Sequence, residues 1–261
     1  MTYTFNLLTS KPNIQFQRGQ TCKLYALSNA MEWLSENYSN QPVPPIVRKQ
    51  KLPNEQNSIR QLAKGLIGSE VGEVYGDLNL LKVAKDSGFT NFKSIECSTI
   101  AQYCAVIQTA IDHNLIPIVV FDVKLSGSNT GHPFNNNGLH EHAAVISSYF
   151  HTKSGELRFN AGQWGHYYGF SAIELAQSNF QLSEVRKPEM FIKSQGGWLN
   201  AKDFSQNDIQ EMKKQGAILR QARRHDLKKH GTFKGRVIIG APNGISYDFN
   251  VNNVVANPNP Q

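Results

Sequence analysis

Three side chains carry the groups that nucleophilic catalysis needs, and they belong to Cys22, His142 and Asn160. A cysteine acts as a nucleophile once its thiol ionises, and an imidazole can accept and return the proton. A side-chain oxygen can orient that imidazole through its second ring nitrogen. Together these groups suit acyl transfer, in which sulfur attacks an amide carbonyl. Gln163 is the competitor of Asn160 for the orienting role, and His140 lies two residues before His142.

We expect Cys22 at the start of a helix over residues 21–36, because apolar residues recur there at helical spacing. The unpaired N–H groups and the dipole of a helix N-terminus favour an anion, so we expect a lowered pKa for this thiol. A glutamine amide just before it could complete an oxyanion hole with the backbone N–H of Cys22. Gln15, Gln17 and Gln20 are the candidates for that role.

We expect the histidine and the asparagine on neighbouring strands of an antiparallel meander. An apolar run and a loop rich in glycine, serine and asparagine indicate its strands, which are residues 116–123, 142–150 and 156–160. His142 would begin the second strand and Asn160 would end the third. Trp164 could then shelter the hydrogen bond between them from water and line a cleft.

The apolar pattern predicts further elements before residue 200. These are helices over residues 58–66, 78–87, 99–114 and 171–178 and a strand over residues 190–193. Thr21 is placed to cap the first helix, and Ser171 stands in capping-box spacing to Glu174. Helices combined with an antiparallel sheet predict the α+β class.

In their order, these segments resemble the papain-like cysteine peptidases, and within them the branch of bacterial double-glycine leader peptidases. The resemblance covers about residues 10–180. The segments that carry it are Thr21-Cys-Lys-Leu-Tyr-Ala-Leu-Ser-Asn-Ala-Met, Asn114-Leu-Ile-Pro-Ile-Val-Val-Phe, His142-Ala-Ala-Val-Ile-Ser-Ser-Tyr, Leu157-Arg-Phe-Asn, Gln163-Trp-Gly and Phe170-Ser-Ala-Ile-Glu-Leu.

The resemblance implies a papain-like fold, in which an N-terminal nucleophile helix packs on the antiparallel sheet. It also implies roles: Cys22 as nucleophile, His142 as general base and acid, Asn160 as orienting residue and a preceding glutamine as oxyanion donor. The spacing of the family favours Gln17 for the last role, with Gln15 and Gln20 as alternatives. This chain departs from the family at Lys23, where glycine or tryptophan is common, and has asparagine where the leader-peptidase branch commonly has aspartate.

Length and composition limit the class of protein. The 261 residues suffice to bury a core without disulfides, and they contain no run of about 20 apolar residues. Three scattered cysteines predict neither a disulfide framework nor a zinc site, and we expect no metal or other cofactor. The N-terminus lacks a signal-peptide pattern, so we expect cytoplasmic synthesis, with secretion by a non-Sec route into a host or competitor cell as a hypothesis.

The formal charge of +7 is concentrated near the C-terminus, where residues 213–236 hold nine lysines and arginines and one acid, Asp226. We predict a basic helix over residues 207–229, followed by a hairpin over residues 236–251 that turns at Asn243-Gly244. Such a helix would bind an acidic protein or an anionic surface. Nucleic acid is not expected, because aromatic residues for base stacking are nearly absent there. The predicted domains are a papain-like domain over residues 1–195 and this extension over residues 196–261.

These features predict a cysteine-dependent hydrolase acting on a protein or peptide, as a thiol protease or a deamidase, with a bacterial effector or toxin as the hypothetical setting. If a lysine or a polyamine accepted the acyl group in place of water, the same triad would give a transglutaminase. The alternative from another class is a catalytically inactive papain-like binding module that uses the basic C-terminal helix.

Overall fold

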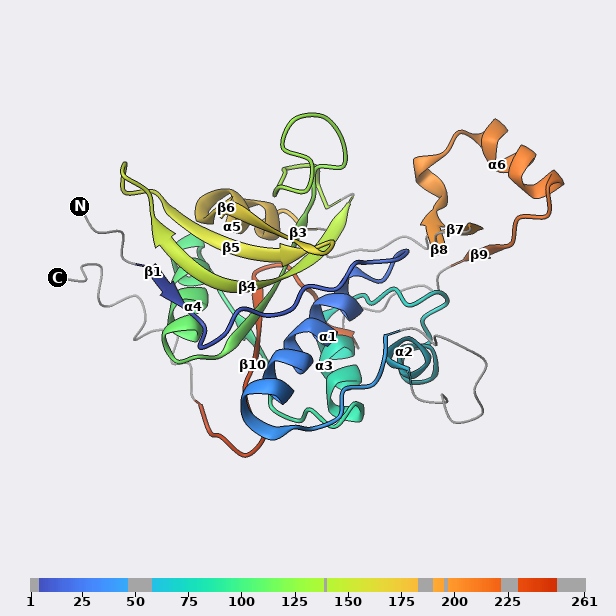
Figure 1. Ribbon diagram of the computed structural model, residues 1–261. Helices are drawn as coiled ribbons and strands as arrows, with labels where there is room; N and C mark the ends of the chain where they lie inside the picture. The colour runs from blue at the N-terminus through green and yellow to red at the C-terminus, as the bar shows by residue number, and fades with distance from the viewer. Residues whose placement is uncertain are drawn as a thin grey trace.

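The computed structural model describes residues 5–46, 58–138, 140–182, 190–194, 197–221 and 230–247 (Figure 1). The helices in these ranges are α1 (Cys22–Leu34), α2 (Ile59–Ile67), α3 (Asp77–Asp86), α4 (Ile100–Asp112), α5 (Ala172–Phe180) and α6 (Gln206–Lys214), with a π-helical turn η1 (Ser35–Ser39) and a 3-10 turn η2 (Ala201–Asp203). The strands are β1 (Phe5–Leu7), β2 (Phe92–Glu96), β3 (Ile116–Asp122), β4 (Glu141–His151), β5 (Leu157–Gln163), β6 (His166–Ser171), β7 (Met190–Ser194), β8 (Gly197–Asn200), β9 (Leu219–Gln221) and β10 (Arg236–Gly240). The α+β class is confirmed.

One antiparallel sheet forms the centre of the molecule, with the strand order β2-β10-β3-β4-β5-β6 and with β1 paired to β4. Because side chains alternate along a strand, each face of the sheet builds its own core. Ile118 and Val120 of β3 pack with α1 and α3, whereas Val119 and Phe121 pack with α4 and α5. The sheet is therefore a layer between two groups of helices (Figure 1).

Helix α1 is the element that presents Cys22, and its packing fixes that position. Leu24, Leu27 and Met31 on its inner face are fully buried against the sheet. Truncating one of them, as in Leu27→Ala, would cost about 2–5 kcal/mol. The predicted Thr21 cap is wrong, because its hydroxyl donates to the main-chain oxygen of Arg18 at 2.8 Å and not into the helix.

The meander predicted around His142 is confirmed as β3, β4 and β5, and β6 extends it. The helices predicted over residues 58–66, 78–87 and 99–114 and the strand over residues 190–193 are also present, within one or two residues at their ends. The helix after residue 171 forms as α5, but Ser171 makes no side-chain capping bond.

The C-terminal part differs from the prediction in both of its elements. Strand β10 does not form a hairpin with the residues after it, because it pairs with β2 on one side and β3 on the other. Its buried apolar residues, such as Val237 and Ile239, suit a central strand, which is covered on both faces. The hairpin expected over residues 236–251 is therefore wrong, and residues 248–251 lie outside the described ranges.

The basic helix expected over residues 207–229 is wrong as one continuous helix. Helix α6 ends at Lys214, where Gly216 takes a positive φ of 85° and the chain turns into β9. Residues 222–229 lie outside the described part of the chain. The domain boundary between residues 195 and 196 stays a prediction, although β10 from beyond it belongs to the central sheet.

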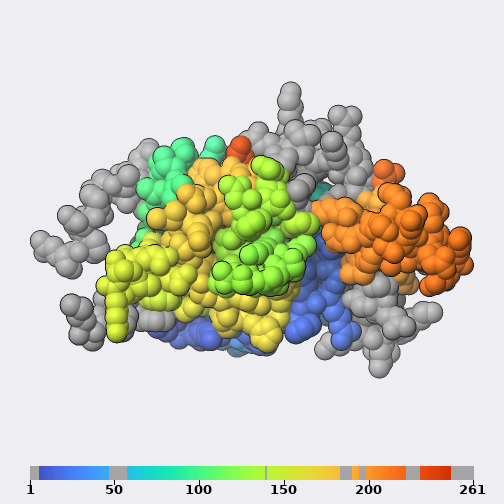
Figure 2. All heavy atoms as spheres, turned by 90° about the horizontal axis from the view of Figure 1, so that it is seen from above, coloured from blue at the N-terminus to red at the C-terminus, as the bar shows by residue number. Residues whose placement is uncertain are grey.

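Strands β7, β8 and β9 form a second, three-stranded sheet, which together with η2 and α6 we call the small module (residues 190–194 and 197–221). Seen from above, it lies at one end of the molecule, beside the blue residues around the start of α1 (Figure 2). Its Phe191 packs against Val71, and the main-chain oxygen of Trp198 accepts a hydrogen bond from the Gln20 N–H at 3.1 Å. The module is thereby joined to the loop that leads into α1. None of the described helices is long and apolar enough to cross a membrane.

Candidate active site

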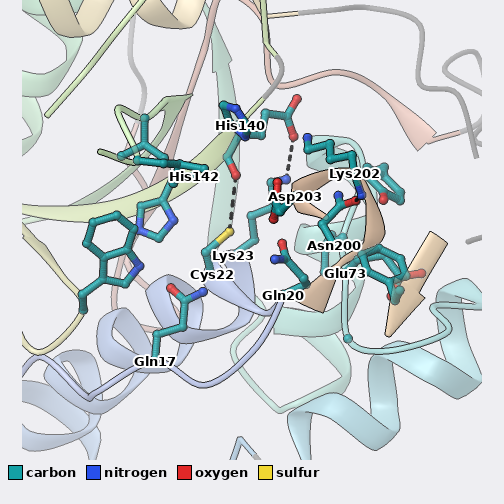
Figure 3. A pocket seen from close by; sticks show the side chains of 18 residues that line it. Gln17, Gln20, Cys22, Lys23, Glu73, His140, His142, Asn200, Lys202 and Asp203 are labelled. Carbon is teal, nitrogen blue, oxygen red and sulfur yellow. Dashed lines mark hydrogen bonds and ion pairs between the residues drawn. The ribbon is translucent and has the colours of Figure 1, made fainter. Parts of the chain in front are cut away.

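A cavity of about 200 Å³ lies where the start of α1, the start of β4 and the small module meet (Figure 3). Four residues that the sequence predicts for the site line it together, and these are Gln17, Cys22, His142 and Trp164. Other polar side chains on its wall are those of Gln20, Lys23, Glu73, His140, Glu141, Asn200, Lys202 and Asp203. Asn160 is not among the residues that line it.

Cys22 is the first residue of α1, and its thiol donates to the main-chain oxygen of Glu141 at a Sγ–O distance of 3.8 Å. Burial raises the pKa of this thiol, against the opposing effects of the Lys23 charge and of nearby backbone N–H groups. The expected lowering of the Cys22 pKa is therefore wrong, because desolvation outweighs the opposing effects of the Lys23 charge and the backbone N–H groups. The thiol is protonated at neutral pH.

His142 follows Glu141 at the start of β4, and its imidazole is enclosed by aromatic rings. The centroid of the Trp164 indole lies 4.6 Å from that of the imidazole, and Phe121 meets the imidazole edge-on at 5.9 Å. Burial, aided by the charge of Lys23, lowers the pKa of His142 to about 3, so its ring is neutral at neutral pH. Its buried Nε2 has no hydrogen-bond partner among the described residues.

Asn160 lies far from this imidazole. It stands opposite Ser148, whose hydroxyl accepts a hydrogen bond from its Nδ2 at 2.8 Å. Because Ser148 is six residues beyond His142 along β4, the separation is roughly 20 Å. The structure therefore does not bring Asn160 to His142, and its assignment as the orienting residue needs correction.

Gln163, the competitor of Asn160, ends β5 near His142. Ala144 on β4 and Ala161 on β5 belong to the same core cluster and so lie on the same face of the sheet. Residues two apart on a strand share a face, so His142 lies on the face of Ala144 and Gln163 on that of Ala161. The Nε2 of Gln163 donates to the main-chain oxygen of Gly131, but its buried Oε1 has no hydrogen-bond partner within the described ranges. An unpaired acceptor on β5 and an unpaired ring nitrogen on β4 thus share one face.

Of the three candidate oxyanion glutamines, Gln17 and Gln20 reach the cavity. Gln17 Nε2 donates to the main-chain oxygen of Gly19 at 2.8 Å, which keeps its amide beside the start of α1 (Figure 3). Gln15 is used elsewhere, since its amide donates to Glu32 at 2.6 Å and to Ser28 at 3.1 Å. The structure therefore favours Gln17 or Gln20 over Gln15 as an oxyanion donor.

Sequence reasoning missed the charged pair beside the thiol. The Lys23 ammonium lies 2.5 Å from the Glu141 carboxylate, and both side chains are more than nine-tenths buried. It also missed Asp122, a buried residue whose carboxylate accepts from the backbone N–H groups of Gly138 and His140 at 2.8 Å each. For the Lys23–Glu141 pair, the only signal in the sequence was that a charged residue stands next to Cys22 and another next to His142.

The remaining titratable candidates do not form a second centre. Cys97 and Cys104 lie in the core on the α4 and α5 face, where burial raises the pKa of each thiol to about 12. Within the described ranges, no group of three or more histidine, cysteine, aspartate or glutamate residues is arranged to hold a metal ion.

The chain matches none of the models of known protein families and none of the curated proteins with which it was compared. Its function is therefore inferred from the geometry of the cavity.

Proposed function

We propose that this protein catalyses cysteine-dependent acyl transfer from an amide of a protein or peptide, as a thiol protease or a deamidase. The observation that carries the proposal is that Cys22, at the tip of α1, and His142, at the start of β4, line the same cavity with Gln17 and Trp164. A papain-like fold and a bacterial effector or toxin setting are the wider hypotheses that this chemistry would fit.

In the first half of the reaction, Sγ of Cys22 forms a bond to the amide carbonyl carbon while its proton moves to His142. The oxyanion so formed would accept hydrogen bonds from the Cys22 backbone N–H and from the amide of Gln17. The C–N bond then breaks, His142 returns the proton to the leaving nitrogen, and a thioester remains.

In the second half, water attacks the carbonyl carbon of the thioester and gives one proton to His142. The C–S bond then breaks, and His142 passes this proton to the departing Cys22 thiolate, which restores the thiol and the neutral imidazole. Because burial keeps the thiol and the imidazole neutral at rest, the proton moves during the attack and not before it. An amine in place of water would give the transglutaminase reaction with the same two residues.

A peptidyl vinyl sulfone tests the proposal, because addition of a thiol to this electrophile also needs a proton delivered to carbon. We expect one adduct by intact mass, mapped to Cys22, and no adduct in Cys22→Ala or His142→Ala. Cys97 and Cys104 are internal controls, since both are buried thiols outside the cavity. An adduct that forms equally fast in His142→Ala would contradict the proposal and favour an inactive binding module.

A further inference from the structure

The ion pair in the cavity wall joins the two residues that are adjacent in sequence to the nucleophile and to the base. Lys23 follows Cys22, Glu141 precedes His142, and their charged atoms lie 2.5 Å apart. The main-chain oxygen of the same glutamate accepts from the Cys22 thiol. The pair therefore places a buried ammonium group beside the reacting atoms (Figure 3).

Aromatic rings hold the ammonium group in place. Lys23 Nζ lies 5.7 Å from the centroid of the Tyr75 ring and 5.3 Å from that of Phe233, within the range of cation–π attraction. These rings and the Glu141 carboxylate offset the cost of burying the charge. The cation is thus a fixed part of the site.

The other charged groups on the cavity wall are arranged differently. Glu73 is buried, and its carboxylate accepts from the Ser69 hydroxyl and from the backbone N–H groups of Glu70 and Val71, at 2.7 to 2.8 Å. Lys202 and Asp203 of η2 are exposed, where solvent screens them. His140 also faces the cavity. Lys23 is the charged residue whose field acts on both Cys22 and His142.

A positive charge in this position favours the thiolate and disfavours the imidazolium, because it attracts the first and repels the second. With the imidazole neutral, Lys23 supplies the positive charge next to Cys22, and the carboxylate of Glu141 partly offsets its field.

We propose that Lys23, and not an imidazolium, is the cation that stabilises the Cys22 thiolate, and that Glu141 sets the strength of this stabilisation. The inference rests on the proposed function, because it concerns the same nucleophile. In this arrangement His142 serves only to move the proton, and the Lys23–Glu141 pair controls the reactivity of the thiol.

The test is the rate of Cys22 alkylation by iodoacetamide as a function of pH, since this reaction needs only the thiolate. We expect Lys23→Met to move the apparent thiol pKa upward and to slow alkylation about tenfold near neutral pH, and Glu141→Gln to speed it. Lys23→Arg should stay near wild type. A purely structural ion pair would instead make Lys23→Met and Glu141→Gln change the rate in the same direction, which would overturn the inference.

A double variant, Lys23→Met with Glu141→Met, covers the case in which a single variant leaves a buried charge unpaired and fails to fold. We expect it to alkylate more slowly than the wild type but faster than Lys23→Met, because no unpaired Glu141 carboxylate is left to repel the thiolate, and a wild-type profile would overturn the inference. His142→Ala separates this inference from the proposed function. We expect His142→Ala to keep the pH dependence of Cys22 alkylation of the wild type while losing acyl transfer. A higher apparent thiol pKa in this variant would show that the imidazolium of His142 stabilises the thiolate, which would overturn the inference. Unchanged acyl transfer in His142→Ala would instead refute the proposed function.

Discussion

The thiol of Cys22 lies 3.8 Å from the main-chain oxygen of Glu141, the residue that precedes His142. This contact joins the N-terminus of α1 to the start of β4, two segments separated by more than a hundred residues in the sequence. The position of the sulfur relative to the imidazole therefore depends on how helix and sheet pack, and not on either element alone.

Gln163 should orient the imidazole of His142, whereas Asn160 should not. We expect Gln163→Ala to lower the rate of acyl transfer by about tenfold or more, because Gln163 Oε1 is the unpaired buried acceptor on the same face of the sheet and would accept from the ring nitrogen of His142 once the ring takes up the proton. Asn160→Ala is the matched control on the same strand, and we expect it to leave the rate unchanged. Nitrogen chemical shifts of the His142 ring report its tautomer directly, and a shift in Asn160→Ala but not in Gln163→Ala would reverse the assignment.

The neutral buried imidazole makes stability depend on pH. Its pKa is lowered from 6.5 to about 3 in the folded protein, so the unfolded chain binds more protons in this window. His142 therefore does not lower the free energy of unfolding above pH 6.5. As the pH falls from 6.5 towards 3, the free energy of unfolding drops by up to about 1.4 kcal/mol per pH unit. Urea unfolding of wild type and His142→Gln at several pH values measures it. Parallel curves for the two proteins would refute this prediction.

Gly131 allows Trp164 and Gln163 to take their positions beside His142. A Cβ atom at Gly131 would lie 3.1 Å from the Trp164 ring and 3.3 Å from Gln163 Nε2, and its φ is +89°. We expect Gly131→Ala to slow acyl transfer and to change tryptophan fluorescence. Gly127→Ala is the control, because it has a similar φ of +78° in the same loop but nothing within 4 Å of a new Cβ. Equal effects of the two variants would show that backbone strain alone is responsible.

Asp122 should stabilise the loop that leads into β4. In Asp122→Asn one of the two carboxylate acceptors becomes an amide donor that faces a backbone N–H, so we expect a loss of about 1–3 kcal/mol or more in the free energy of unfolding. Asp86→Asn, an exposed change on α3, should have little effect. Chemical denaturation of both variants measures the difference, and an unchanged Asp122→Asn protein would argue against this anchor.

The sequence predicts those parts of the fold that depend on local pattern. Helix α1 and strands β3 to β5 are apparent from apolar spacing and turn residues, and Cys22 and His142 are indeed brought to one cavity. Strand β10 could not be placed, because it pairs with strands that lie about 120 and 140 residues earlier. No periodicity encodes such a pairing.

Errors at element ends account for the misplaced site residue. The third strand of the meander was expected to end at Asn160, but β5 continues to Gln163, so the residue that reaches the His142 end of the sheet is a different one. Strand ends are set by tertiary pairing as much as by composition, and three residues suffice to change the assignment. The Lys23–Glu141 pair likewise depends on how α1 meets β4.

Cleavage of a peptidyl p-nitroanilide tests the central claim, that Cys22 is a nucleophile served by His142, most directly, because the leaving nitrogen of this amide must receive a proton as the C–N bond breaks. Nitroaniline release gives the rate, and intact mass with peptide mapping locates the acyl group. We predict a thioester on Cys22 in the wild type and at least a hundredfold slower nitroaniline release in His142→Ala, of the order expected for loss of a general acid and base. Release of nitroaniline at the same rate in both proteins would contradict the claim.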